Sequence, residues 1–431
     1  MLVEFRIKNF RSFRDEQVLS LVANNDTTLS KNCFEVGKLR LLKIAGIYGS
    51  NASGKSNLIN AMDTMRDIVL KSARSKPGTR VPVVPFLLDN ESKGEPSFFE
   101  VTFYNEGIRY QYGFTATTKR IQNEWLIAYP KRYAQSWYER AFNEKTNKTD
   151  WKFGSFLKGD KITLADKTRE DCLFLSVGAQ WNNEQLTTVY EWFKGKLRVA
   201  PPKEQFRPVT AEILLDVQED EEAREEMYQF ITQTLHKADL GICGVNVKEL
   251  EFDTEKIKFP KGMPQELREK VVKRLKREPR LKVELLHIDK TTGKKVPFLL
   301  EQESDGTQRF FQLLGPWFET VVLGFTVFID ELEASLHPLL TRELVKFIQE
   351  PINNGHGAQL IFATHDTTLL DPKLFRRDQI WFTEKDEGGG TNLYSMSDYK
   401  ERRPRKGEEM QKGYLSGRYG AIPILEAFSL K

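Results

Sequence analysis

The chain begins with alternating apolar and charged residues. Val3, Phe5 and Ile7 are apolar and the residues between them are charged, and this period of two is typical of a strand with one buried face. Longer runs that are mostly apolar predict strands buried on both faces. These runs cover residues 41–48, 321–329 and 359–363.

A β-hairpin is predicted further along the first half of the chain. Segments 98–104 and 108–115 have strand character, and Asn105-Glu106-Gly107 between them tolerates positive φ. Segments 124–137 and 151–164 predict further strands. The N-terminal half is therefore expected to be rich in strands.

A helical period replaces the strand pattern after about residue 200. Segment 218–237 is charged, with an apolar stripe that includes Met227, Ile231 and Leu235. We therefore predict an α/β protein with a mixed sheet, a strand-rich N-terminal lobe and an inserted helical region. The predicted divisions are residues 1–200, 201–300 and 301–431.

A second helix, rich in Lys and Arg, is predicted over 265–282. Two interpretations stay open for it. A solvated amphipathic face explains the pattern, and so does a surface at 267–282 that contacts nucleic-acid phosphates. The net charge of +4 over 431 residues is too small to decide between them.

Composition excludes several classes of protein. There is no run of 18 apolar residues and no basic-then-apolar start, so no membrane span is predicted. The cysteines are odd in number and lack metal spacing; they are Cys33, Cys172 and Cys243. A cytoplasmic location is expected.

The segment Gly49-Ser-Asn-Ala-Ser-Gly-Lys-Ser56 fits the phosphate-loop pattern in full. It lies between a predicted strand and a predicted helix, which is the context that binding of a nucleoside triphosphate requires. Lys55 would neutralise the outer phosphates and Ser56 would complete a Mg²⁺ shell. The nucleotide-binding residues predicted in and beside this loop are Gly49, Asn51, Ser53, Gly54, Lys55, Ser56 and Asn57.

Two later strands also end in polar residues. Asp330-Glu331 follows the run 321–329, and His365 follows 359–363. Because ligands bind at the carboxyl ends of parallel strands, we expect both to face the phosphate loop. Asp330 is the predicted metal ligand, Glu331 the general base, and His365 a group that contacts the γ-phosphate or the attacking water. His337 is the second choice among the histidines.

A helix start is predicted at Ser304-Asp305-Gly306-Thr-Gln308. Ser304 is a good N-cap, and Gly306 allows a close backbone approach. Such a start can bind an anion, although a capped helix explains the same residues. Its place just upstream of Asp330-Glu331 favours the anion site.

Together these motifs resemble the ABC-type ATPase heads of structural-maintenance-of-chromosomes and recombination proteins. Gly49–Ser56 resembles their Walker A motif, Ser304–Gln308 their signature motif and Phe328–Glu331 their Walker B motif. Ser335–His337 resembles the D-loop, and His365 the switch histidine. One departure is Asp305, where the signature motif normally has Gly.

The chain as a whole resembles the AAA15-type ATPases of anti-phage loci, a group that includes RloA-type abortive-infection ATPases and those of PARIS-like systems. The resemblance rests on segments 9–13, 49–57, 304–307 and 414–423. Phe10-Arg-Ser12 resembles the N-terminal loop of the ABC-type heads, which implies that Arg11 and Ser12 lie beside the bound nucleotide.

The resemblance implies an ATPase with ATP and Mg²⁺ as cofactors. Two copies would sandwich two ATP molecules, Walker A of one facing Ser304–Gln308 of the other, in a homodimer or larger assembly. ATP would control a separately encoded effector, such as a Toprim-like nuclease, in defence against phage. The alternatives are a DNA-end or repair ATPase and a scaffold that binds ATP without turnover.

Overall fold

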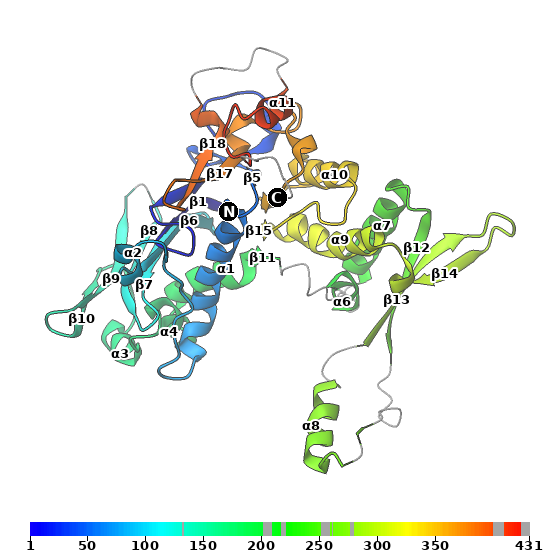
Figure 1. Ribbon diagram of the computed structural model, residues 1–431. Helices are drawn as coiled ribbons and strands as arrows, with labels where there is room; N and C mark the ends of the chain where they lie inside the picture. Colours follow the sequence, from blue (N-terminus) through cyan, green and yellow to red (C-terminus); the bar gives the residue numbers. More distant parts are fainter. Residues whose placement is uncertain are drawn as a thin grey trace, which may run out of the picture. The chain divides into compact units, whose positions relative to one another are not determined.

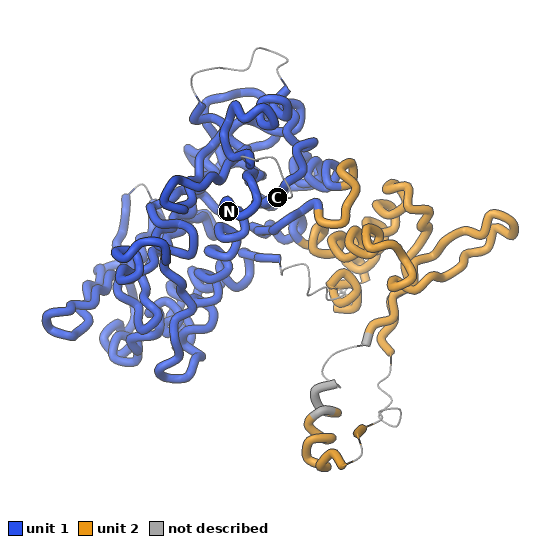
Figure 2. The backbone as a smooth tube through the Cα atoms, viewed as in Figure 1, with its two compact units in different colours: residues 1–202, 320–333, 341–431 blue, residues 203–319, 334–340 orange. Residues whose placement is uncertain are grey.

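The computed structural model describes residues 1–131, 133–200, 209–216, 221–250, 259–260, 262–275, 280–399 and 409–423. It divides into two compact units, which Figure 2 distinguishes by colour. Unit 1 contains residues 1–202, 320–333 and 341–431, and unit 2 contains residues 203–319 and 334–340. Within the described ranges, no helix combines the length and apolar character needed to cross a membrane.

One sheet of unit 1 is antiparallel, with strands in the order β10-β9-β8-β7-β6-β1-β2. Its strands are β1 (Leu2–Lys8), β2 (Gln17–Ser20), β6 (Ser97–Asn105), β7 (Ile108–Ala116), β8 (Ile121–Tyr129), β9 (Gln135–Asn143) and β10 (Lys148–Phe153). The predicted hairpin is confirmed, because Glu106 and Gly107 join β6 to β7 with φ of 50° and 77°. Phe5 and Ile7 of β1 are fully buried, as their alternation predicts.

The second sheet of unit 1 has the order β11-β15-β16-β5-β17-β18 and is parallel except for β18. Its strands are β5 (Ile44–Gly49), β11 (Leu197–Val199), β15 (Thr326–Ile329), β16 (Gln359–Ala363), β17 (Ile380–Lys385) and β18 (Thr391–Ser395). Every residue of β5, β15 and β16 is buried, as expected for parallel strands covered on both faces. The α/β fold with parallel and antiparallel strands is thus confirmed.

Unit 1 also contains helices, which Figure 1 colours by their position in the sequence. Those before residue 200 and after residue 337 are α1 (Lys55–Lys71), α2 (Asn90–Gly94), α3 (Lys161–Lys167), α4 (Phe174–Gln180), α5 (Glu184–Glu191), α10 (Pro338–Gln349) and α11 (Met410–Leu415). The predicted strand 151–164 is wrong beyond Phe153, where β10 ends. Asp160 accepts a hydrogen bond from the Thr163 backbone N–H at 3.0 Å, and this N-cap starts α3 instead.

The apolar run 321–329 is not one strand. Its first residues end helix α9 (Asp305–Leu323), and β15 begins at Thr326. Gly324 lies between them with φ of 66°, the left-handed conformation that commonly ends a helix. The prediction failed because an apolar run alone does not distinguish a buried strand from a helix end, where Val322 and Leu323 are exposed.

The run 41–48 also holds two strands. β4 (Leu39–Leu42) pairs with β3 (Cys33–Val36), and β5 begins at Ile44. Lys43 separates them, and its buried Nζ donates a hydrogen bond to the Gln349 carbonyl at 2.9 Å.

Unit 2 contains a small sheet in addition to helices. The helices are α6 (Val209–Asp216), α7 (Glu221–Lys237), α8 (Gln265–Leu275) and the start of α9, and the antiparallel sheet is β12 (Ile242–Leu250), β13 (Arg280–Ile288) and β14 (Lys295–Leu299). The predicted stripe of Met227, Ile231 and Leu235 is buried on α7. Of the predicted helix 218–237, residues 218–220 lie outside the described residues.

The predicted helix 265–282 is too long. α8 ends at Leu275, residues 276–279 lie outside the described residues, and β13 starts at Arg280. Val283 and Leu285 of β13 are buried. Their period of two marks a strand, so the basic residues from Arg280 onward do not extend a helical surface.

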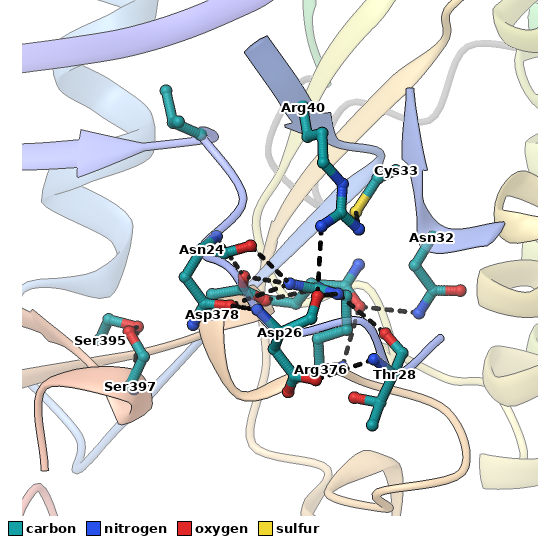
Figure 3. A network of polar contacts seen from close by, with 12 residues as sticks. Asn24, Asp26, Thr28, Asn32, Cys33, Arg40, Arg376, Asp378, Ser395 and Ser397 are labelled. Carbon is teal, nitrogen blue, oxygen red and sulfur yellow. Dashed lines mark hydrogen bonds and ion pairs between the residues drawn. The ribbon is translucent and has the colours of Figure 1, made fainter. Parts of the chain in front are cut away.

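A fully buried guanidinium joins two distant segments of unit 1 (Figure 3). Arg376 donates to both carboxylate oxygens of Asp378, at 2.9 and 2.7 Å. It also donates to the carbonyls of Asp26 and Thr28, at 2.7 and 2.8 Å, and to Asn24 Oδ1 at 3.0 Å. The turn-rich segment 24–28 is thereby held against the residues that precede β17.

Another buried ion pair stabilises the antiparallel sheet. Glu124 is fully buried and lies 3.2 Å from the guanidinium of Arg140. Its carboxylate also accepts hydrogen bonds from the hydroxyls of Tyr112 and Tyr138 and from the backbone N–H of Phe174, at 3.1, 2.8 and 2.8 Å. These bonds connect β7, β8 and β9 to the first turn of α4.

We expect Glu124→Ala to lower the free energy of unfolding by about 3–5 kcal/mol, because it leaves Arg140 buried without its partner. The matched control is Glu139→Ala in β9, whose exposed carboxylate lies 3.8 Å from Lys152 and should contribute within about 1 kcal/mol. Urea denaturation measures both. Equal losses would show that the buried pair contributes no more than a surface pair.

Candidate nucleotide site

The predicted phosphate loop connects β5 to α1, and the lysine of the loop is hydrogen-bonded to the loop's own backbone. The Lys55 ammonium donates hydrogen bonds to the carbonyls of Gly49 and Ser50, at 2.9 and 3.0 Å. Lys55 is buried, whereas Asn51 and Ser56 are exposed. The loop therefore holds its cation in place and presents the Ser56 hydroxyl to solvent.

Two threonines that the sequence did not single out pack against this loop. A Cβ on Gly49 would lie 2.5 Å from the Thr383 carbonyl oxygen, and one on Gly54 would overlap the Thr391 side chain. Gly54 also has φ of 120°, so only glycine fits there. The Thr383 hydroxyl lies 2.6 Å from Ser53 Oγ, and the Thr391 hydroxyl donates to the Ser53 carbonyl at 2.8 Å.

Ser12 also lies beside the loop. Its hydroxyl accepts a hydrogen bond from Asn57 Nδ2 at 2.8 Å and lies 2.9 Å from the Thr391 hydroxyl. The Thr391 backbone N–H donates to the Ser12 carbonyl at 2.7 Å. The N-terminal loop, the start of α1 and β18 therefore meet at one point.

Arg11 is placed by its backbone more than by its side chain. It has φ of 50°, and its N–H donates to the Val84 carbonyl at 2.7 Å. The side chain is exposed, with the guanidinium 5.6 Å from the centre of the Phe10 ring. A role in binding nucleotide stays a prediction for both Arg11 and Ser12.

Asp330 and Glu331 directly follow β15, at the carboxyl edge of the parallel sheet. Asp330 Oδ1 is buried and has no hydrogen-bond partner in the described part of the chain. Burial of the ammonium group lowers the pKa of Lys55, and the carboxylates of Asp330, Glu333 and Glu331 act against this shift. The lysine and these carboxylates therefore share one electrostatic environment.

The residues fit a bound Mg²⁺. A buried carboxylate oxygen that no described residue contacts by a hydrogen bond, such as Asp330 Oδ1, suits a hard cation. Among the residues that the structure describes, no group of three or more His, Cys, Asp or Glu side chains could hold a metal alone. Mg²⁺ commonly takes one carboxylate, waters and nucleotide phosphates, and Asp330 with Ser56 matches that pattern.

Glu333 was not predicted, and it connects the end of β15 to His365. Its Oε1 accepts a hydrogen bond from the His365 backbone N–H at 2.7 Å, while its Oε2 is buried and finds no partner within the ranges that the structure describes. Partial burial and the charge of Lys55 lower the pKa of His365. The neutral imidazole is thereby favoured, and it can both donate and accept a hydrogen bond. The only signal in the sequence was an acidic residue three positions after Asp330.

In unit 2 the structure brings the predicted signature and D-loop motifs together. A Cβ on Gly306 would lie 2.8 Å from the Ser335 carbonyl oxygen. Ser304 caps α9, because its Oγ accepts from the Thr307 backbone N–H at 3.2 Å. Ser304 and Asp305 are exposed, and the Gln308 side chain donates to the Glu303 carbonyl at 2.8 Å.

His337 is exposed, and its ring is hydrogen-bonded to the backbone two residues further on. Its Nδ1 accepts a hydrogen bond from the Leu339 backbone N–H at 3.2 Å. This contact lies in the first turn of α10, so His337 helps to begin that helix.

The family model described as "AAA domain, putative AbiEii toxin, Type IV TA system" matches residues 44–164 and 203–371, which is more than half of the chain. The chain belongs to this AAA family. The match spans the phosphate loop, Ser304–Gln308, Asp330-Glu331 and His365, and it supports a P-loop ATPase. Among curated proteins, none matches the sequence of this AAA-family member.

Similarity to solved structures is distant. The SMC head domain from Thermotoga maritima has 12% identity and a TM-score of 0.39, covering 91% of this chain and 98% of that one. An SMC head bound to the C-terminal winged-helix domain of ScpA has 11% identity and a TM-score of 0.41, covering 91% and 97%. The ATP-binding cassette MJ0796, a dimer bound to ADP and Pi, has 11% identity and a TM-score of 0.29, covering 91% and 98%. Because these scores are low, the description of this AAA-family fold rests on the strand order and loop above.

Proposed function

We propose that this protein binds ATP with Mg²⁺ and hydrolyses it at the carboxyl edge of its parallel sheet. One observation carries the proposal: the buried Lys55 ammonium shares its environment with a buried Asp330 oxygen that has no partner among the described residues. A buried carboxylate oxygen without a partner costs stability unless a ligand satisfies it. A magnesium nucleotide offers phosphate oxygens to the lysine and a cation to the carboxylate.

Each residue then has a defined part in hydrolysis. The backbone N–H groups of residues 49–54 cradle the phosphates, and Lys55 neutralises their charge. Ser56 and Asp330 would hold Mg²⁺, which would supply positive charge to the phosphates. Glu331 takes the proton of the attacking water, and His365 orients that water or the γ-phosphate.

A second copy of the chain completes the site. Ser304 caps the 19-residue helix α9, which begins at Asp305, and the N–H groups and dipole of a helix start attract phosphate. Exposed Ser304 and Asp305 of one copy, and exposed Asn51 and Ser56 of the other, are available to a shared ATP. Because ATP contacts both copies only when they are together, it favours the dimer.

The dimer regulates a separately encoded effector in defence against phage. The resemblance to AAA15-type anti-phage ATPases and a family description that names a toxin of a toxin–antitoxin system support this role. The effector proposed is a nuclease of the Toprim kind. Lys55→Ala should abolish protection against phage in cells, and unchanged protection would contradict the defence role.

A DNA-end or repair ATPase is the second candidate, because α8 presents exposed basic residues that include Arg268 and Lys270. A protein that contacts phosphate backbones binds plain duplex DNA with a steep salt dependence. Such binding at physiological salt would favour this candidate. Its absence would favour control of an effector.

The dimer is tested by a bulky cation at the predicted contact. We expect Ser304→Arg, made in the Glu331→Gln background, to stay monomeric with ATP, while Glu331→Gln alone reaches dimeric mass in light scattering. The affinity of the monomer for ATP should change little, because its own phosphate loop is intact. Ser304→Ala is the matched control, since it loses the same N-cap bond to Thr307 without adding bulk. An ATP-dependent dimer of Ser304→Arg would refute the shared site.

A further inference from the structure

The described C-terminal segment, residues 409–423, folds over the end of the phosphate-loop strand. We call it the tail. Its short helix α11 (Met410–Leu415) lies next to β17 and β18 (Figure 1). The Tyr414 ring lies 6.0 Å from the Tyr48 ring and stacks on Phe382 at 5.5 Å. Tyr48 and Phe382 are paired across β5 and β17.

These two aromatic residues directly precede the groups that shape the loop. Tyr48 is followed by Gly49, and Phe382 is followed by Thr383, whose hydroxyl lies 2.6 Å from Ser53 Oγ. Aromatic pairs of this kind stabilise beyond their buried area. The ring of Tyr414 therefore packs on the residue before the phosphate loop and on the residue before Thr383, which contacts that loop.

The tail is fixed in this position by its own hydrogen bonds. The Tyr414 hydroxyl donates to the Ala421 carbonyl at 3.1 Å, and the Ala421 backbone N–H donates to Glu384 Oε1 at 3.1 Å. The hydroxyls of Tyr394 and Tyr399 both donate to the Tyr419 carbonyl, at 2.9 and 3.0 Å. The tail is thus bound to β17 and β18 at several points along its length.

The tail also reaches the loop that carries His365. Gln411 Nε2 donates a hydrogen bond to the Thr367 hydroxyl at 3.1 Å. Thr367 lies two residues after His365, in a turn capped by Asp366, whose Oδ1 accepts from the Thr368 backbone N–H at 2.9 Å. One short segment therefore contacts β5, β17 and the turn that follows β16.

We propose that Gln411 and Tyr414 are positioning residues, and that the tail holds the His365 loop in register with the phosphate loop. The proposal deepens the function proposed above and rests on it. Hydrolysis needs the phosphate loop and the His365 loop in one geometry, whereas ATP binding needs mainly the phosphate loop. Loss of the tail contacts should therefore slow turnover more than it weakens the affinity for ATP. Misplaced catalytic groups lower the rate even when the fold is kept.

The test compares full-length variants by steady-state turnover, ATP affinity and hydrogen exchange. Gln411→Ala should lower kcat by about 3–10-fold, as the loss of one hydrogen bond allows, with ATP affinity close to wild type. Amides at 365–370 should exchange faster. Tyr414→Phe keeps the ring and should retain most of kcat, whereas Tyr414→Ala should not. Lys412→Ala, an exposed change on the same helix, is the control.

The outcomes separate the two proposals. If wild type hydrolyses ATP and Gln411→Ala matches Lys412→Ala in kcat and exchange, the tail proposal is wrong. If kcat, ATP affinity and melting temperature fall together, the tail is structural only, which also refutes positioning. If wild type shows no turnover, the proposed hydrolysis fails. Hydrogen exchange at 365–370 then decides by itself whether the tail holds that loop.

Discussion

Glu331→Gln is expected to bind ATP like wild type and to hydrolyse it about 10²–10⁴-fold more slowly, the range that a general base contributes. Glutamine has nearly the same shape, so the turn after β15, where Glu331 has φ of 49°, should persist. The amide cannot accept the proton of the attacking water. Phosphate release in a single turnover measures the rate, and titration with a fluorescent ATP analogue measures affinity.

Glu333→Gln is the matched control for this change. It alters a carboxylate two residues away and keeps an oxygen that can accept the 2.7 Å bond from the His365 backbone. We expect a smaller loss of kcat than for Glu331→Gln. If Glu331→Gln turns over like wild type, the assignment of the base is wrong. If wild type binds ATP without turnover, the protein is a scaffold.

Lys55→Ala is expected to weaken ATP binding by about 10–100-fold, the range that a lost charge-assisted hydrogen bond implies. The variant removes the buried cation and leaves Asp330, Glu331 and Glu333 to repel the phosphates. Isothermal titration measures the dissociation constant. Lys71→Ala, at the other end of α1 and paired with Asp67 in solvent, should not change it. Equal affinity for Lys55→Ala and wild type would contradict the phosphate-loop assignment.

Sequence patterns predicted the parts of the fold in which local and tertiary preferences agree. The alternation of Val3, Phe5 and Ile7 predicted β1, and a two-residue positive-φ turn predicted the β6–β7 hairpin. The phosphate loop was predictable because glycine, lysine and serine occupy fixed positions between strand and helix. These signals are local, so one sequence is enough to see them.

The errors have a physical cause as well. Residues 321–323 are as apolar as β15 but end α9, and Val322 and Leu323 are exposed there, so an apolar run alone marks neither a strand nor a buried position. The basic segment after Leu275 looked helical by composition, although the alternation of Val283 and Leu285 makes it β13. In a short segment the helical and strand periods can both fit the sequence, and pairing with other strands in the folded protein then determines which element forms.

The candidate site was predictable only in its sequence-adjacent motifs. Thr383 and Thr391 support the phosphate loop from strands more than 300 residues away along the chain, and no local pattern marks them. Glu333 and Gln411 contact the loop that carries His365 through single hydrogen bonds. Such contacts depend on which strands are neighbours in the folded sheet, so a local sequence pattern cannot predict them.

The central claim is that two copies of the chain share each ATP. The most direct measurement mixes Lys55→Ala with Ser304→Arg, each carrying a different fluorophore, and follows energy transfer and phosphate release after ATP is added. Each variant alone should neither associate nor turn over. The mixture should do both, because the loop of one and Ser304–Gln308 of the other form one intact site. Full turnover by Ser304→Arg alone, with no gain on mixing, would contradict the account.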